Sequence, residues 1–322
     1  MTTSTAAPTR SLSRAAKGVG ASGSGASRPP RRRTIASRGS LTLLLLIAPS
    51  VFLLILINAY PVVYAAIQSV HDGSLIATGE FVGLDNFVQV LTSEPFWKAT
   101  GFTLVFTLVG VFGSWLLGLG LALLLRTRIP AGGVFKVLLL LPWIVPVVVS
   151  STAWNWLVAT PDSPLPTIWR TLGWGTPLFL ADPTLAAITV CVFKVWVSFP
   201  FMMMMTASAL ASVDENVYEA SNMDGANKWQ QFTGITLPLI ARSTYISWIL
   251  MTIFCVNDFP TIYLLTGGGP VDATTSLVVL AYRTVFQNFQ TGPGIAIAFL
   301  MTATLVVVSV VLYRQIRKSA VE

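Results

Sequence analysis

Six long stretches of the sequence contain almost no acidic or basic residues, and this pattern limits the possible folds more than any other feature. Each stretch exceeds the roughly 20 apolar residues that a helix needs to cross about 30 Å of hydrocarbon. Charged residues bound the stretches at 38–72, 98–126, 136–162, 182–214, 242–272 and 283–314. Only Lys194 and Asp258 interrupt them. The sequence therefore predicts an all-α integral membrane protein with six transmembrane helices.

The overall composition supports a lipid environment. Hydrophobic residues make up 54% of the 322 residues and charged residues 10%, whereas soluble globular proteins carry about 25% charged residues. Mean hydropathy is +0.72. These values exclude an ordinary soluble enzyme, a disordered chain and a nucleic-acid binder. With two cysteines and one histidine, we predict no disulfide framework, no metal site and no cofactor.

The basic residues predict the orientation. Six spans put both termini on one side, and sixteen of the 20 Lys and Arg residues would lie on that side, in the N-terminal tail, two loops and the C-terminal end. Loops rich in Lys and Arg remain cytoplasmic. We expect a multi-pass protein of the bacterial cell (inner) membrane with both termini inside. The first stretch is too long for a cleaved signal peptide and indicates an uncleaved helix.

Composition divides the chain into a disordered basic tail at 1–38, a six-helix domain at 39–318 and a short tail at 319–322. The basic tail is interpreted as a topology signal or as a contact for anionic lipid headgroups. Outside the membrane, Glu80–Phe87 is expected to form a short interfacial helix. The proline-rich loop 159–182 is expected to be compact, and its role is open.

The cytoplasmic loop 211–237 predicts two short helices joined at a glycine. Ser212 and Glu215 have the spacing of a capping box, with Ser212 as N-cap. Gly225 suits a left-handed helix end. A second helix presents Trp229 and Phe232 on one face and is expected to end at Leu237-Pro238, where the fifth span begins. The pair either lies on the membrane surface or fits a groove on a cytoplasmic partner.

The run from Glu219 to Ala226, followed by Ile235-Thr236-Leu237-Pro238, resembles the EAA loop of ABC-importer permeases. Three further segments are similar to the carbohydrate branch of that family: Phe81–Phe87, Leu141-Pro142 with Trp154, and Leu265–Pro270. The resemblance covers about 41–318. Ser221 replaces the third alanine of the motif, and the loop at 159–182 departs from the family pattern.

The resemblance implies a set of partners: a second homologous permease, two cytoplasmic ABC ATPase subunits, an extracytoplasmic sugar-binding protein and the surrounding lipids. It also implies that one surface of the loop docks on an ATPase. The residues assigned to that surface are Glu219, Ala220, Ser221, Asp224, Gly225, Ala226, Trp229 and Phe232. No G-x-x-x-x-G-K-[ST] phosphate loop is present, so we predict that the chain is not an enzyme and that partners hydrolyse ATP.

Ionisable residues inside a bilayer indicate functional sites. Asn257, Asp258 and Tyr263 carry groups that match a sugar, and Pro260 is expected to break the fifth span beside them. Alternatively, Asp258 forms a polar lock between helices at the permease dimer interface. Lys194 either extends its ammonium to the headgroups or meets a partner in the pore or across the permease dimer. Trp196 is a weaker candidate for the pathway.

These observations predict a permease subunit that forms half of a pathway for a sugar or sugar-like solute. Glycerophosphate and polyols remain alternatives, and the sequence identifies neither the solute nor the subunit that binds it. An ion-driven secondary transporter fits less well, because such proteins favour several intramembrane acids and inverted repeats. A membrane enzyme would need a convergent set of catalytic residues, which the sequence lacks.

Overall fold

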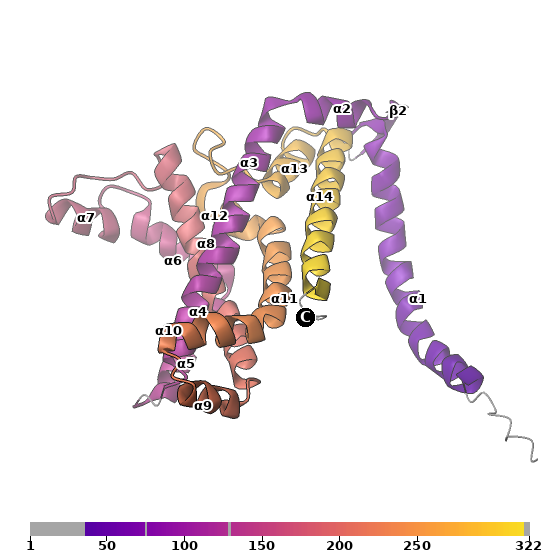
Figure 1. Ribbon diagram of the computed structural model, residues 1–322. Helices are drawn as coiled ribbons and strands as arrows, with labels where there is room; N and C mark the ends of the chain where they lie inside the picture. Colours follow the sequence, from indigo (N-terminus) through magenta and orange to yellow (C-terminus); the bar gives the residue numbers. More distant parts are fainter. Residues whose placement is uncertain (1–35, 75, 128–129, 319–322) are drawn as a thin grey trace, which may run out of the picture. The chain divides into compact units, whose positions relative to one another are not determined.

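The computed structural model describes residues 36–74, 76–127 and 130–318, most of them helical (Figure 1). The chain divides into two units, Met1–Ile57 and Asn58–Glu322. Of the predicted tails, only 36–38 are described, and they already belong to the first helix. The elements in order are α1 (Ala36–Ser69), β1 (His71–Gly73), β2 (Thr78–Phe81), α2 (Asp85–Thr92), α3 (Glu94–Leu108), the π-helical η1 (Val109–Gly113), α4 (Ser114–Leu124), α5 (Gly132–Ile144), α6 (Val147–Val158), α7 (Pro164–Thr171), α8 (Pro183–Ala211), α9 (Glu215–Met223), α10 (Lys228–Gln231), the π-helical η2 (Phe232–Thr236), α11 (Leu237–Val256), α12 (Phe259–Thr266), α13 (Leu277–Phe286) and α14 (Thr291–Lys318).

Five helical segments of the described chain are long and apolar enough to cross a membrane, and a bent pair of helices can supply a sixth. The five are Thr42–Ser69, Glu94–Leu124, Pro183–Ala211, Lys228–Val256 and Thr291–Gln315. The predicted all-helical membrane fold is confirmed at this level. The sixth predicted span starts later than expected, because Arg283 lies within the separate helix α13.

The third predicted span, 136–162, is not one straight helix. α5 and α6 meet at an angle of 92°. Between them Val145 is extended, with ψ 132°, and Pro146 follows as the N-cap of α6. A residue before proline is pushed out of the helical region by the proline ring, which explains why the helix ends here.

The fifth predicted span is also interrupted. α11 ends at Val256 and α12 begins at Phe259, so the break falls at Asn257 and Asp258. The predicted break is confirmed, although it lies before Pro260 rather than at it. Pro260 occupies the first turn of α12, where its missing N–H costs nothing. Asp258 Oδ1 accepts the backbone N–H of Thr261 at 3.1 Å and thereby caps the new helix.

A buried ion pair joins this break to α8. Lys194 Nζ lies 2.7 Å from Asp258 Oδ2, and the two side chains are 7% and 9% exposed. Of the alternatives for Lys194, extension toward the headgroups is therefore wrong, and its ammonium meets a partner within the chain. An ammonium beside a carboxylate is far cheaper to bury than either charge alone, and Asp258 is in reach because the break exposes it to α8. Asp258 thus links two helices of one chain.

Close packing of α4 against α8 depends on a glycine. A Cβ at Gly118 would lie 2.6 Å from the backbone nitrogen of Met203, so no larger residue fits without movement. Met202 and Met203 are buried at this contact. Small residues of this kind let membrane helices approach closely.

A two-stranded hairpin is the one departure from an all-α fold among the described residues. β1 pairs antiparallel with β2, His71 opposite Phe81. The short helix expected at 80–87 begins only at Asp85, as α2, because Glu80 and Phe81 belong to the strand. Buried Asn86 secures the connection by donating to the carbonyls of Ser69 and His71 at 2.9 and 3.0 Å.

We predict that Lys194→Met and Asp258→Asn each lower the free energy of unfolding by about 3–5 kcal/mol, because each leaves an unpaired buried charge. The double variant should be more stable than either single variant, since the asparagine can still cap α12. A denaturant titration of the purified permease in detergent measures this. Lys98→Met is the control: it removes an exposed 2.8 Å pair with Glu94 and should cost at most about 1 kcal/mol. Wild-type stability of both single variants would contradict the prediction.

Candidate functional site: the elbow of residues 211–237

α9 begins with an aspartate cap rather than the predicted serine cap. Asp214 is the N-cap, and its Oδ1 accepts the backbone N–H of Asn216 at 3.0 Å. Ser212 has helical dihedrals, with φ −83° and ψ −8°, and ends α8. Its hydroxyl donates to the carbonyl of Ala209. The predicted capping box from Ser212 to Glu215 is therefore wrong, because an N-cap needs extended dihedrals that Ser212 lacks.

Gly225 closes α9 as the sequence predicts. Its φ is +80°. The N–H of Gly225 donates to the carbonyl of Asn222 at 3.1 Å, and that of Ala226 to the carbonyl of Ser221 at 3.0 Å. These two bonds form a Schellman motif, the ending that favours glycine. A Cβ at this position would meet nothing within 4 Å, so backbone conformation rather than space explains the glycine.

The second helix starts with a capping box that the sequence analysis missed. Asn227 Oδ1 accepts the N–H of Gln230 at 2.9 Å, while Gln230 Oε1 accepts the N–H of Asn227 at 2.8 Å. The three-residue spacing of Asn227 and Gln230 in the sequence could have indicated this capping box. The predicted end of this helix at Leu237-Pro238 is wrong, because α10, η2 and α11 follow one another without a break. Proline fits within a continuous helix here because the neighbouring turn is already π-helical.

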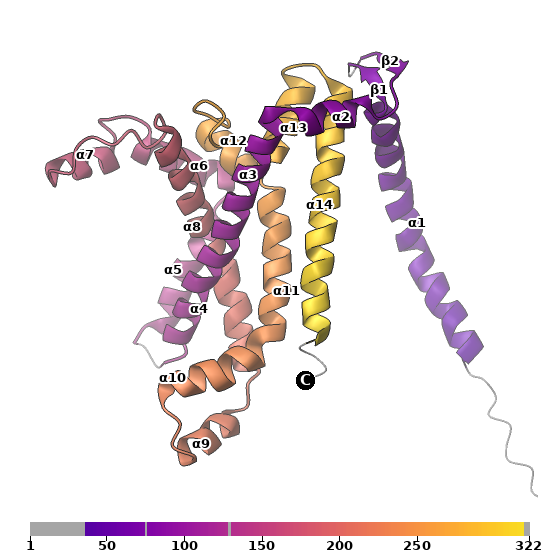
Figure 2. The same cartoon turned by 45° about the horizontal axis from the view of Figure 1, so that its top comes forward.

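Polar side chains hold the inner face of the elbow. Gln231 is 5% exposed, and its Nε2 donates to Asn222 Oδ1 at 2.6 Å and to the carbonyl of Ala226 at 3.3 Å. These bonds tie α9 to α10 across the glycine turn. Figure 2 shows α9 below α10, with α11 rising from the far end of α10. The elbow is thus a braced unit of two helices.

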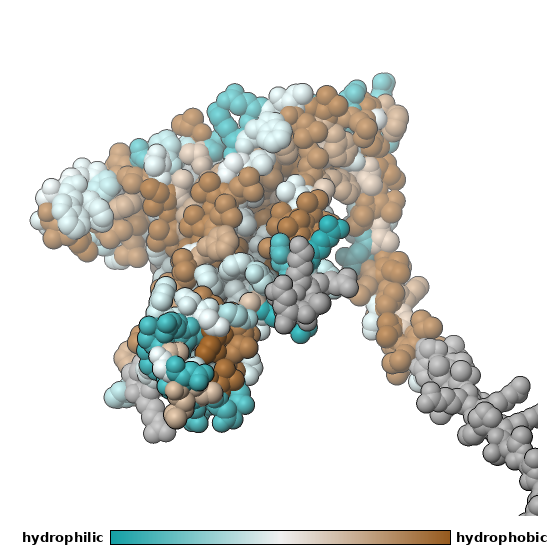
Figure 3. Space-filling view, viewed as in Figure 1, coloured by the Kyte–Doolittle hydropathy of each residue, from teal (hydrophilic) through white to brown (hydrophobic). Residues whose placement is uncertain are grey.

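The outer face of the elbow combines acidic and apolar side chains. Glu219, Ala220 and Asp224 are exposed, Trp229 is 71% exposed, and Met223, which the sequence analysis did not assign, is 89% exposed. Figure 3 shows hydrophobic residues over the membrane-spanning helices and hydrophilic ones gathered on the elbow. Such a surface can bind a partner that offers basic groups and an apolar pocket.

Two residues assigned to the docking surface lie elsewhere. Ser221 is buried, and its hydroxyl donates to the carbonyl of Tyr218 at 2.8 Å. Phe232 is half-buried against a core cluster that includes Leu210 and Ile240. Both support the elbow from inside rather than lie on its surface. Sequence spacing could not reveal this, because the inner side of α9 is set by contacts with other helices.

The residues assigned to the substrate pathway lie in three places: at the break between α11 and α12, in an aromatic contact of α8, and in an aromatic cluster on α12. Lys194 meets Asp258, as described above. Neighbouring Asn257 is exposed, and its Nδ2 donates to the carbonyl of Ile253. Trp196 instead packs with Trp154 and Phe193, at centroid distances of 5.6 and 5.9 Å.

Tyr263 belongs to an aromatic cluster that the sequence analysis did not identify. Its ring stacks on Phe259 with centroids 4.6 Å apart and meets Tyr282 at 5.3 Å, and Phe286 continues the cluster. The sequence does place Phe259 and Tyr263 four residues apart on one helix, and Tyr282 and Phe286 four apart on another, so each pair could be predicted to share a helix face. Only the fold brings α12 and α13 together.

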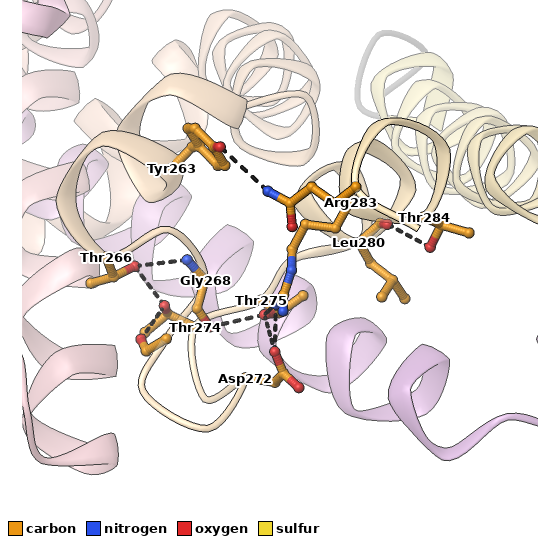
Figure 4. Close-up of polar contacts among 11 residues, drawn as sticks. Tyr263, Thr266, Gly268, Asp272, Thr274, Thr275, Leu280, Arg283 and Thr284 are labelled. Carbon is orange, nitrogen blue, oxygen red and sulfur yellow. Dashed lines mark hydrogen bonds and ion pairs between the residues drawn. The ribbon is translucent and has the colours of Figure 1, made fainter. Parts of the chain in front are cut away.

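Beyond Tyr263 the glycine-rich segment forms an internally bonded loop (Figure 4). Thr274 Oγ1 lies 2.7 Å from Thr266 Oγ1 and donates to the carbonyl of Gly269 at 2.7 Å, and Thr275 Oγ1 donates to the carbonyl of Gly268 at 2.9 Å. Arg283 pairs with Asp272 across the loop. The segment at 267–270 is thus part of a loop held by threonine hydroxyls.

In the described part of the chain, no three His, Cys, Asp or Glu side chains come together in a way that could hold a metal ion. Lys194 and Asp258 are the only ion pair among the described residues with both side chains less than 10% exposed. The arrangement contains a braced, exposed surface on the elbow and a polar break within a span.

Comparison with known proteins identifies the family of this chain. Residues 114–320 match the family model "Binding-protein-dependent transport system inner membrane component". The trehalose/maltose transport system permease protein MalF of Thermococcus litoralis is 33% identical over 273 residues, which cover 84% of this chain and 92% of that protein. The sulfoquinovosyl glycerol transport system permease protein SmoG of Agrobacterium fabrum is 32% identical, over 86% and 91%.

The fold is also similar to a solved structure. In a bacterial ABC transporter involved in the import of the acidic polysaccharide alginate, one chain superposes with a TM-score of 0.75 at 18% identity, covering 87% of this chain and 96% of that chain. This likeness supports the fold alone. By the family model and the sequence relatives, the chain belongs to the binding-protein-dependent transport system inner membrane components, as a multi-pass ABC permease of the carbohydrate branch.

Proposed function

We propose that this permease forms half of the pathway of an ATP-driven importer for a sugar or sugar-like solute, and that the elbow docks on a cytoplasmic ATPase subunit. The observation that carries the proposal is the structure of the elbow. Its inner face is held by hydrogen bonds, and its outer face exposes Met223 and Trp229. A solvent-exposed tryptophan on a braced helix is typical of a binding surface. The assembly would contain a second permease, two ATPases and an extracytoplasmic binding protein.

The proposed orientation puts the elbow and both termini in the cytoplasm. The guanidinium of Arg126, in the basic turn after α4, lies 4.7 Å from the ring centroid of Tyr218 on α9, so this turn and the elbow share one end of the helices. α14 ends at the same end (Figure 1). Basic residues at this end favour the cytoplasmic side, where ATP is available.

A sugar is the proposed solute class because the related permeases named above serve a disaccharide and a glycoside. The proposed pathway residues are Asn257, Asp258, Tyr263, Lys194 and Trp196. The break between α11 and α12 supports this assignment, since irregular backbone at membrane depth is tolerated where it lines a cavity or is buried in protein. Tyrosine rings and amide groups are suited to sugar faces and hydroxyls.

Transport by reconstituted liposomes tests the proposed function. We expect uptake of radiolabelled trehalose or maltose only when the second permease, the ATPase subunits, the binding protein and ATP are all present. Uptake by this chain alone under an ion gradient would refute the proposal and indicate a secondary transporter. Ligand screening of the co-encoded binding protein identifies the solute if both disaccharides fail.

We predict that Gly225→Val abolishes co-purification of the ATPase subunits while membrane insertion is retained. A β-branched side chain is strained at φ +80°, even where space is open. Gly225→Asn should retain at least half of the bound ATPase, because asparagine tolerates this region. Gly234→Ala, where an added Cβ also meets nothing within 4 Å, is the matched control. Normal assembly of the valine variant would show that this bend is not needed for docking.

We predict that Trp229→Ala weakens ATPase binding at least tenfold, as truncation of an aromatic anchor commonly does. Asn216→Ala changes an exposed polar residue of α9 and should leave binding within twofold. Titration of purified ATPase subunits onto the permease in nanodiscs gives both affinities. If the tryptophan variant binds as tightly as the wild type, the exposed indole is not a docking contact.

A further inference from the structure

Tyr218 connects α9 with two membrane-spanning segments through one side chain. Its hydroxyl lies 3.1 Å from Thr236 Oγ1, at the end of η2 where α11 begins. The face of its ring meets the guanidinium of Arg126, two residues after α4 ends. Thr236 is 4% exposed, so the hydroxyl pair is shielded from competing water.

A second set of bonds extends this contact along the inner face of α9. Thr236 Oγ1 also lies 3.2 Å from the carbonyl of Gln231, and Gln231 bonds Asn222. Tyr218 and Asn222 are four residues apart, so they share one face of α9. Glu219 comes directly after Tyr218 and Met223 directly after Asn222, and both of these side chains are exposed on the outer face. α9 is therefore bonded on one face and open on the other.

The chain itself holds α9 only through turns. On one side Ser212–Asp214 leads from α8, and on the other Gly225 leads to α10. A helix joined only by such turns would pivot when a docked partner moves. If side chains of α9 are bonded to a neighbouring membrane-spanning helix, that helix moves when α9 pivots, because coupling travels through contiguous contacts.

We infer that Tyr218 is a positioning residue that transmits the movement of α9 to the second and fifth spans, through Arg126 and Thr236 respectively. The inference rests on the proposed docking of the elbow on an ATPase. Tyr218 itself is half-buried beneath the outer face and need not touch the partner. Its loss should therefore uncouple the spans from the ATPase without releasing the ATPase.

The test uses the complete complex in nanodiscs with a cysteine reporter at Leu239, which is 53% exposed near the start of α11. Native Cys191 and Cys255 are buried, and complexes that lack the reporter correct for their labelling. The measured quantity is the change in maleimide labelling rate caused by MgATP with vanadate. Co-purified ATPase is quantified in the same samples.

We expect Tyr218→Phe and Thr236→Val each to reduce the nucleotide-dependent change about fivefold, the usual effect of one hydrogen bond. The double variant should lose no more than either single variant, since both changes remove the same bond. Thr236→Ser keeps the hydroxyl and should respond as the wild type does. Thr233→Val is the matched control, because the Thr233 hydroxyl bonds only the carbonyl of Trp229 one turn earlier.

Two results would overturn the inference. An unchanged nucleotide response in Tyr218→Phe and Thr236→Val would show that the movement reaches the fifth span by another route. Loss of ATPase from these variants would make Tyr218 a docking residue instead. If the wild-type permease itself retains no ATPase, the proposed function fails, and that result is obtained without any Tyr218 variant.

Discussion

Hydrocarbon offers a peptide backbone no hydrogen-bond partner, so every interruption of a membrane-spanning helix must be satisfied from within the protein. The break between α11 and α12 meets this requirement with one side chain, since Asp258 caps the first turn of α12. The same carboxylate introduces a charge at a buried position, and Lys194 balances it. α8, α11 and α12 are thus joined at one point by electrostatics rather than by apolar packing alone.

The elbow likewise satisfies its helix ends with its own residues. A loop between two spans carries its own caps at Asp214 and Asn227, its own left-handed ending at Gly225, and buried bonds from Gln231. Because these local bonds hold the elbow together, the side chains on its outer face are not needed for its stability. Acidic and apolar side chains on that surface are therefore available for recognition, which is consistent with the docking role proposed for the elbow.

Local sequence patterns predicted those features that depend on local physics. The charge-free stretches indicated the membrane-spanning helices, and Gly225 indicated its own left-handed conformation. Features set by distant contacts were missed. The sequence left open whether Lys194 reaches the headgroups or a partner, because that partner lies 64 residues away. The aromatic cluster of Tyr263 and Tyr282 depends on two separate helices.

Local rules also compete with one another, and this explains the remaining errors. Ser212 had the spacing of a helix cap, yet the end of α8 extends through it and Asp214 takes the role. The bend at Val145-Pro146 followed a known steric rule, but hydropathy over 136–162 gave no sign of it. Ser221 and Phe232 matched a surface motif by position, yet Phe232 packs against a cluster from α4, α8 and α11, and Ser221 is buried with its hydroxyl bonded to the carbonyl of Tyr218.

The unbroken passage from α10 through η2 into α11 has a consequence for the length of this segment. Each residue of an α-helix advances the chain by about 100° of rotation. One residue gained or lost between Lys228 and Leu237 would rotate the whole of α11 about its axis and carry Asp258 away from Lys194. The number of residues between the elbow and the break in the fifth span therefore sets the direction in which Asp258 faces.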